Sequence, residues 1–385
     1  MDNLAHSLVG LAAAKAGLEK LSPGATAVCI IAANAPDLDF LSAISGDRWM
    51  VLHYHRGISH SVLGTLLLGV AIPTLFCVIE RVASWSRRRP PHFRFAGLLL
   101  ASLIACATHP LLDWTNNYGV RPFLPWSDRW FYGDLVFVVD PVLWLVFGAA
   151  AFLLTSKSRR QVSLWGLLAA TLTILFAYVA IVGRGLDHPV VALSAWIVAL
   201  LAIFYCFRID LGKRFGSKIA ITAFLTLLAY WGGLGLLHSK ALTAAADQAQ
   251  TLVAGKNETI VKLAAMPTPT NPAHWRCVVE TDKAAYRFEV YLRHPKVDAK
   301  DVLRYAKPDG AEADIVALAA KDRRAQAFFE FARFPVEKVI GAGCGAQTLV
   351  QFADLRYTEP GKSRGNFSLE LPVECTPTDV RTDGR

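Results

Sequence analysis

The chain has 385 residues, of which 54% are hydrophobic and 18% are charged, and its formal net charge is +9 at pH 7. Long apolar runs exclude a disordered or collagen-like chain, and seven cysteines in this length exclude a small disulfide-stapled protein. The charge is unevenly spread, because 21 of the 40 basic and 19 of the 31 acidic residues fall in the last 147 positions. The composition predicts an integral membrane protein with a polar C-terminal domain.

Two short apolar segments come first. Leu4–Ala16 is rich in alanine and predicts a helix, whereas Ala25–Ala35 is too short to cross a bilayer alone and is typical of half a hairpin. The first 20 residues place Lys15 and Lys20 late and have no basic stretch before an apolar core. They do not match a cleaved signal peptide, so we expect His6 to stay in the mature protein.

Six longer apolar stretches follow, each near the length of about 20 residues that a helix needs to span a hydrocarbon core. In chain order they are Ser61–Ile79, Phe95–Leu112, Leu135–Leu154, Ser163–Val182, Val190–Phe207 and Ile219–Leu237. The predicted fold is a mainly α polytopic bundle of about six spans with short N-terminal helices. Residues 1–238 would form this membrane-embedded domain.

The basic residues of the loops predict the orientation of the spans. Loops on one side carry twelve Lys and Arg residues, among them Arg87, Arg88 and Arg89, and the loops on the other side carry five. The positive-inside rule places the first set in the cytoplasm and the second set outside. This bias also explains the basic net charge, so no nucleic-acid partner is expected.

The last part, residues 239–385, predicts a small extracytoplasmic α+β domain after a Pro-rich link at Met266–Pro272. Strands are expected at Arg276–Thr281, Tyr286–Arg293, Thr348–Arg356 and Asn366–Glu374, and a helix at Asp314–Arg333. In an oxidising compartment Cys277, Cys344 and Cys375 would allow one disulfide and leave an odd thiol. The cysteines of the apolar segments, Cys29, Cys77, Cys106 and Cys206, are expected to be inert packing residues.

Histidines and aspartates of the apolar half gather at one predicted membrane face, the outer one. They are His6, Asp37, Asp39, His55, His60, His109, Asp113 and Asp140. Ionisable groups at membrane depth persist mainly where they pair, line a cavity or bind an ion. Imidazole nitrogens and carboxylate oxygens together suit Zn²⁺ or a similar divalent ion.

The motif HPLLD places two of these side chains on one helical face, because His109 and Asp113 are four residues apart. We expect Pro110 to break the helix locally between them. A single zinc ion takes three or four protein ligands, so eight candidates predict two or more ions. Each motif by itself is also compatible with a purely structural role, such as a helix cap for PDLD. The metal hypothesis depends on the whole set of motifs.

As a set, an early His, PDLD, HRGxxHS, HxxxD with NNYG, and Asp140-Pro141 resemble the inner-membrane-bound metal-dependent hydrolases of the YdjM/YfhP type. The resemblance covers about the first 145 residues, and NPAHWR, FARFP and DLRY are similar to the tails of longer members. Its ligand order is similar to that of zinc-dependent phospholipase C, although no further HxxxE or HxxxD follows here. The resemblance implies a bacterial inner membrane protein with the ligands His6, Asp39, His60, His109 and Asp113.

The reaction that such ions favour is hydrolysis of a phosphate ester. Asp37 or Asp39 would act as general base, and Arg56 would bind phosphate oxygens or else hold Asp37 or Asp140 in an ion pair. Asn117 and Tyr118 would contact the substrate or form a structural turn. Because the site opens at headgroup level, the expected substrate is a phospholipid or another lipid-linked phosphate.

Two other classes of protein fit the same residues. A cation transporter would also hold His and Asp within the membrane, but its site is expected nearer the midplane, and the last three predicted spans carry almost no ionisable residues. A non-catalytic scaffold would use the metal only to hold short helices together. Metal-dependent turnover, cation flux and chelator-induced unfolding distinguish the three hypotheses.

Overall fold

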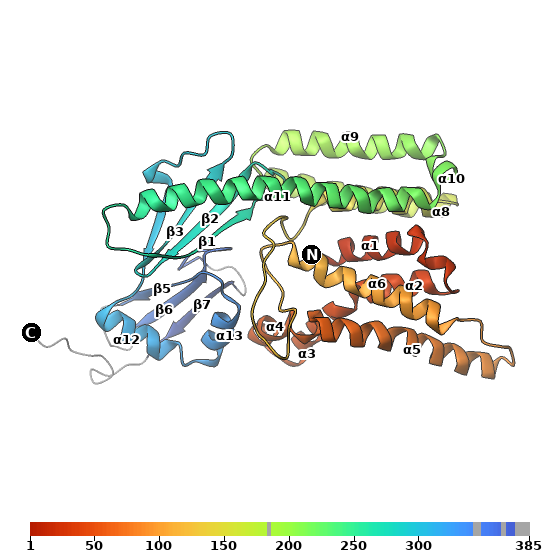
Figure 1. The fold of residues 1–385 in the computed structure, drawn as a ribbon, viewed down its shortest axis with the longest axis horizontal. Coiled ribbons are helices and arrows are strands. Elements are labelled where there is room, and N and C mark those ends of the chain that lie inside the picture. The colour runs from red at the N-terminus through yellow and green to blue at the C-terminus, as the bar shows by residue number, and fades with distance from the viewer. Residues whose placement is uncertain (183–185, 342–347, 363–366, 374–385) are drawn as a thin grey trace, which may run out of the picture. The chain divides into compact units, whose positions relative to one another are not determined.

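A computed structural model describes residues 1–182, 186–341, 348–362 and 367–373 (Figure 1). The chain forms two compact units, each made of several segments. The helical unit comprises Met1–Leu38, Arg56–Leu236 and Thr268–Pro272, and the sheet unit comprises Asp39–His55, Leu237–Pro267 and Ala273–Arg385. The sheet unit thus includes a short N-terminal segment that a single boundary after residue 238 does not contain.

The helical unit consists of long apolar helices joined by short turns. Its elements are α1 (Asn3–Ala16), η1 (Leu18–Lys20), α2 (Ala25–Asn34), the start of η2 (Ala35–Leu41), η3 (Ile58–His60), α5 (Val62–Ser86), α6 (Phe95–Trp114), α7 (Pro141–Thr155), α8 (Arg159–Val182), α9 (Pro189–Arg208), α10 (Leu211–Phe215) and the first part of α11 (Ser217–Val253). Large apolar side chains such as Leu66, Leu67 and Leu100 are half exposed on these helices. An apolar outer surface is what a helix in contact with lipid requires.

Six helical runs in the described part of the chain are long and apolar enough to cross a membrane, and a mainly helical membrane protein is confirmed. They do not match the six predicted spans one to one, because Ala25–Ile44 is among them, whereas α7, the helix of the predicted span Leu135–Leu154, has only 15 residues and is not. The run Ala25–Ile44 is longer than expected, because η2 continues α2. The predicted span Leu135–Leu154 was wrong at its start: α7 begins only at Pro141, since the Asp140 carboxylate caps it and proline occupies its first position.

The N-terminal helices pack closely. α1 contacts α2, α6 and α7, and α2 also contacts α5 and α6, so these helices lie side by side (Figure 1). Their shared core is built of small side chains such as Ala14, Cys29, Ala101 and Cys106. At Gly10 of α1, an added Cβ would lie 2.7 Å from the Cys29 carbonyl oxygen of α2. Small residues therefore set the distance between α1 and α2.

The sheet unit contains two antiparallel sheets, with strand orders β1-β2-β3-β4 and β5-β6-β7. Its elements are α3 (Ser42–Ser45), α4 (Arg48–Tyr54), the end of α11, β1 (Ile260–Pro267), β2 (His274–Thr281), β3 (Ala284–Tyr291), η4 (Ala299–Asp301), β4 (Leu303–Ala306), α12 (Gly310–Ala319), α13 (Arg323–Phe331), β5 (Pro335–Ile340), β6 (Leu349–Asp354) and β7 (Ser368–Pro372). All four predicted strands overlap observed ones. β1, β4 and β5 were missed because they are short or partly exposed.

The single helix predicted at Asp314–Arg333 was wrong. The segment forms two helices, α12 and α13, because the Asp322 carboxylate accepts a hydrogen bond from the Arg324 backbone N–H and starts a new helix there. The second of these helices packs against α4, which brings the segment 39–55 into this unit.

The core of the sheet unit lies between α11 and the first sheet. An alanine stripe of α11, which includes Ala241 and Ala245, packs on Trp275, Cys277 and Phe288. Cys277 is a free thiol, and burial raises its pKa well above the usual range, so it is unreactive. Cys344 and Cys375 lie outside the described residues, and the disulfide stays a prediction.

Candidate metal centre

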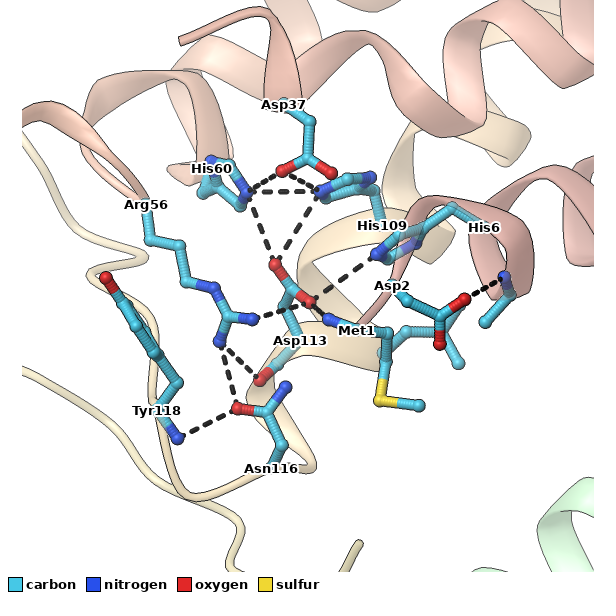
Figure 2. Close-up of polar contacts among 12 residues, drawn as sticks. Met1, Asp2, His6, Asp37, Arg56, His60, His109, Asp113, Asn116 and Tyr118 are labelled. Carbon is cyan, nitrogen blue, oxygen red and sulfur yellow. Dashed lines mark hydrogen bonds and ion pairs between the residues drawn. The ribbon is translucent and has the colours of Figure 1, made fainter. Parts of the chain in front are cut away.

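Five histidine and aspartate side chains of the helical unit converge from four elements. His6 lies in α1, Asp37 in η2, His60 at the end of η3, and His109 and Asp113 near the end of α6 (Figure 2). Since α5 begins immediately after His60 and α6 ends immediately after Asp113, the ends of two candidate spans present these ligands. The predicted break at Pro110 was wrong, because α6 continues through this proline to Trp114.

Four of these side chains form a group whose ligand atoms all lie within 4.8 Å of one another: Asp37, His60, His109 and Asp113. The Nε2 atoms of His60 and His109 are 3.1 Å apart, and Asp37 Oδ1 lies 3.4 Å from each of them. Asp113 Oδ2 lies 3.3 Å from His60 Nε2 and 3.6 Å from His109 Nε2. All four side chains are nearly inaccessible to solvent, and Asp37, at 7%, is the most exposed.

These separations match the donor set of a tetrahedral metal site. Four ligand atoms placed at about 2.0–2.1 Å from a zinc ion lie about 3.3–3.4 Å apart, and two imidazoles with two carboxylates are ligands that zinc accepts. The five separations given above run from 3.1 to 3.6 Å, and all ligand atoms of the group lie within 4.8 Å of one another. The residues could therefore hold a metal ion.

The orientation of His109 also fits this role. Its Nδ1 lies 2.7 Å from the Ala33 carbonyl oxygen, which can only accept a hydrogen bond. Nδ1 therefore carries the proton, and in the neutral ring the lone pair of Nε2 points into the group. Such a fixed tautomer is typical of metal-ligating histidines.

His6 lies beside the group. Its ring stacks on that of His109, with the ring centroids 3.7 Å apart, and its Nε2 is 3.5 Å from Asp113 Oδ1. The residue is fully buried, yet in the described part of the chain neither ring nitrogen has a hydrogen-bond partner. An orphaned buried imidazole is costly unless another group binds it, so His6 is a further candidate ligand.

Arg56 holds Asp113 rather than Asp37 or Asp140. Its guanidinium donates to the Asp113 carboxylate and main-chain carbonyl, at 3.0 and 3.2 Å, and to Asn116 Oδ1 and the Gly119 carbonyl oxygen, both at 3.0 Å. It also stacks on the Tyr118 ring, with Cζ 4.4 Å from the centroid, and is only 3% exposed. Arg56 thus forms an ion pair with Asp113, which is neither of the two predicted partners, and its role in phosphate binding stays a prediction.

The other oxygen of Asp113 faces the histidines, so this carboxylate connects two sets of contacts. Oδ1 accepts from Arg56 and from the Met1 amino group, whereas Oδ2 faces His60 and His109 (Figure 2). The Arg56 guanidinium on one oxygen fixes the direction of the other oxygen.

The remaining predicted site residues are not members of this four-residue group. Asp39 and His55 belong to the sheet unit, where His55 Nδ1 is 3.0 Å from Asp39 Oδ1. Asp140 is outside the four-residue group: it caps α7 at Val142 N–H and accepts a hydrogen bond from the Tyr230 hydroxyl at 2.9 Å. Asn117 is buried in the turn after α6, and Tyr118 contacts Arg56.

Sequence reasoning missed two residues of this turn. Asn116 accepts from both Arg56 and the Tyr118 backbone N–H, and Gly119, with φ of 87°, presents its carbonyl to Arg56. The signal was present in the motif NNYG, because asparagine and glycine are the residues that tight turns favour. Only the folded structure shows that Asn116 of this turn binds Arg56, which lies 60 positions earlier in the sequence.

Fold and site together define a multi-pass helical membrane protein with a buried group of histidines and aspartates that could bind a metal ion. Residues 1–183 match the family described as YdjM inner membrane protein. The Bacillus subtilis (strain 168) protein "Uncharacterized protein YfhP" is 26% identical over 155 residues, which cover 38% of this chain and 43% of that relative. The chain thus matches less than half of that relative's length. No solved structure matches.

Proposed function

We propose that this protein is a membrane-bound, metal-dependent hydrolase that acts on the phosphate ester of a membrane lipid at the outer face of the inner membrane. The observation that carries the proposal is the buried group Asp37, His60, His109 and Asp113, three of whose members lie at or next to the ends of two candidate spans. Buried ionisable residues within membrane segments are expensive and mark functional sites. The match to an inner membrane family supports the location.

Asp37, His60, His109 and Asp113 would hold the ion, with His6 as a further donor. We propose zinc because the ligands are nitrogen and oxygen atoms at tetrahedral spacing. A bound divalent ion polarises a phosphoryl oxygen and lowers the pKa of water, which is the chemistry that phosphate-ester hydrolysis needs. A second ion remains a prediction from the number of candidate ligands.

The chain's own residues have separate tasks in this proposal. Asp37 has the most exposed side chain of the group, which supports it as the general base that would take a proton from the attacking water. Arg56 is a positioning residue, since its donors are directed at Asp113 and the turn that follows it. Asn117 and Tyr118 belong to the same turn, where they would border the substrate.

The transporter and scaffold alternatives give different results in one set of measurements. Purified protein in detergent is tested for bound metal by elemental analysis and for zinc-dependent turnover of a chromogenic phosphodiester. His109→Ala is compared with His188→Ala, whose exposed side chain precedes α9. We expect His109→Ala to lose the metal and to lower turnover by about 10²-fold or more, while His188→Ala keeps both.

Full metal content in His109→Ala would refute the site. A metal that is bound without turnover would favour the scaffold, provided that chelation lowers the Tm. Cation flux into liposomes without turnover would favour the transporter.

A further inference from the structure

An apolar pocket of about 400 Å³ lies in the helical unit beside the metal-ligand group. Its walls come from the start of α5, the end of α6 and the loop 120–131, and they include Val62, Leu66, Leu111, Trp114, Phe123 and Phe131. Polar side-chain atoms among its described lining residues come from His60, Thr65 and the Trp114 indole. The volume lies within the range of about 300–1,000 Å³ that is typical of ligand pockets.

The rim of this pocket lies on a lipid-facing surface. Val62 and Leu66 belong to one candidate span and Leu111 to another, and each of the three side chains is at least half exposed. Around a membrane span, the molecules that contact such side chains are the hydrocarbon chains of lipids. Trp114 lies at the last position of α6, where tryptophan is favoured at a membrane–water interface.

The loop that closes the pocket is held in place by its own hydrogen bonds. Val120 and Phe131 exchange two backbone hydrogen bonds, of 3.0 and 2.9 Å, and Val62 N–H donates to the Pro122 carbonyl oxygen at 2.9 Å. The Phe123 and Phe131 rings meet edge to face. The wall is therefore formed before any ligand binds, which reduces the entropic cost of binding.

His60 joins the pocket to the metal-ligand group. It lines the pocket, and its Nε2 faces Asp37, His109 and Asp113. A cavity with an apolar lining, in whose wall one imidazole of the metal-ligand group lies, fits an amphiphile with a hydrocarbon chain and a charged head.

We propose that this pocket holds the hydrocarbon chain of a membrane lipid whose phosphate group lies at the metal-ligand group, with His60 at the boundary between chain and head. The lipid enters sideways from the bilayer between the ends of α5 and α6. This inference rests on the proposed function and adds a specificity: long-chain lipid phosphates are preferred over short-chain ones. Leu66 is then a specificity-determining residue.

The test compares two neighbouring leucines of α5. Leu66 lines the pocket, whereas Leu67 does not, and both are exposed on the same helix. Full-length protein in lipid nanodiscs is photolabelled with a phosphatidic acid that carries a diazirine in its acyl chain, and the labelled peptides are mapped. We expect labels on the lining residues and at least about tenfold less labelling there in Leu66→Trp, because the indole occupies the pocket. Leu67→Trp should label like the unchanged protein.

Hydrolysis of long-chain and short-chain phosphatidic acids is measured in parallel. We expect Leu66→Trp to lose turnover of the long-chain lipid and to keep turnover of the short-chain lipid. Its metal content and its elution volume in size-exclusion chromatography should be unchanged. Equal pocket labelling in both variants, or labels spread evenly over the helices, would overturn the lipid pocket. If neither lipid is hydrolysed while pocket labelling persists, the proposed function fails and the chain-binding site stands.

Discussion

Asp113 is the central residue of the candidate site, because its two carboxylate oxygens contact different partners. One oxygen accepts from Arg56 and the other faces His60 and His109. Arg56 in turn donates to Asn116 and Gly119, so one buried guanidinium ties the carboxylate to the turn after α6. A planar group with several fixed donors suits this arrangement, and an ammonium does not.

We therefore expect Arg56→Lys to weaken metal binding about 10–100-fold, the usual cost of losing a residue that orients a ligand. The measurement is a zinc titration against a competing chelator. Arg87→Lys, in the exposed turn after α5, is the control and should bind zinc as the unchanged protein does. An unaltered zinc affinity in Arg56→Lys would mean that Asp113 needs no such support.

At the scale of elements, the packing of α1 on α2 places two parts of the site. α1 carries His6, and α2 carries Ala33, whose carbonyl oxygen holds His109. Gly10 lets the two helices approach, since a Cβ there would lie 2.8 Å from the Ala33 Cβ and 2.7 Å from the Cys29 carbonyl oxygen. The backbone carbonyl cannot move aside without shifting α2.

Gly10→Ala should accordingly lower the stability by about 1–3 kcal/mol, as overpacking does, although alanine is the better helix former. Gly148→Ala on α7 is the matched control, because its Cβ would meet only Leu8, at 3.9 Å. We expect a lower Tm and less bound zinc for Gly10→Ala, and an equal or higher Tm for Gly148→Ala. Equal Tm values for both variants would show that α1 can move away without cost.

At the scale of the whole molecule, the distribution of Lys and Arg predicts which loops face the cytoplasm. Ser86 lies at the end of α5 in the basic set, and Ser127 lies in the loop after α6, on the side of the metal-ligand group. Both serines are exposed, so cysteines placed there test the two sides with matched accessibility.

In intact spheroplasts a membrane-impermeant maleimide should label Ser127→Cys and not Ser86→Cys. The measured quantity is the labelling of each variant in excess of that of the unchanged protein, which carries only the native cysteines. After permeabilisation both should react. The reverse pattern in intact cells would place the site on the cytoplasmic side and overturn the outer-face part of the proposal.

Several features of this protein follow from the sequence alone. Apolar runs of membrane length predict the spans because hydrocarbon thickness sets a length that any helix must meet. The spacing of His109 and Asp113 predicts their shared face because a helix repeats every 3.6 residues. The start of α7 and the break between α12 and α13 were missed, although Asp140 and Asp322 are recognisable caps, because apolar or helical patterns continued across them.

Tertiary structure alone decided which candidates meet. Eight residues were candidate ligands, and the resemblance implied five of them: His6, Asp39, His60, His109 and Asp113. The fold gathers Asp37, His60, His109 and Asp113 in one group, places His6 beside it, pairs Asp39 with His55, and uses Asp140 as a cap. It also pairs Arg56 with Asp113 and adds Asn116. Local sequence rules act over a few residues, whereas these contacts join positions some 60 apart whose distance depends on how closely small side chains let the helices pack.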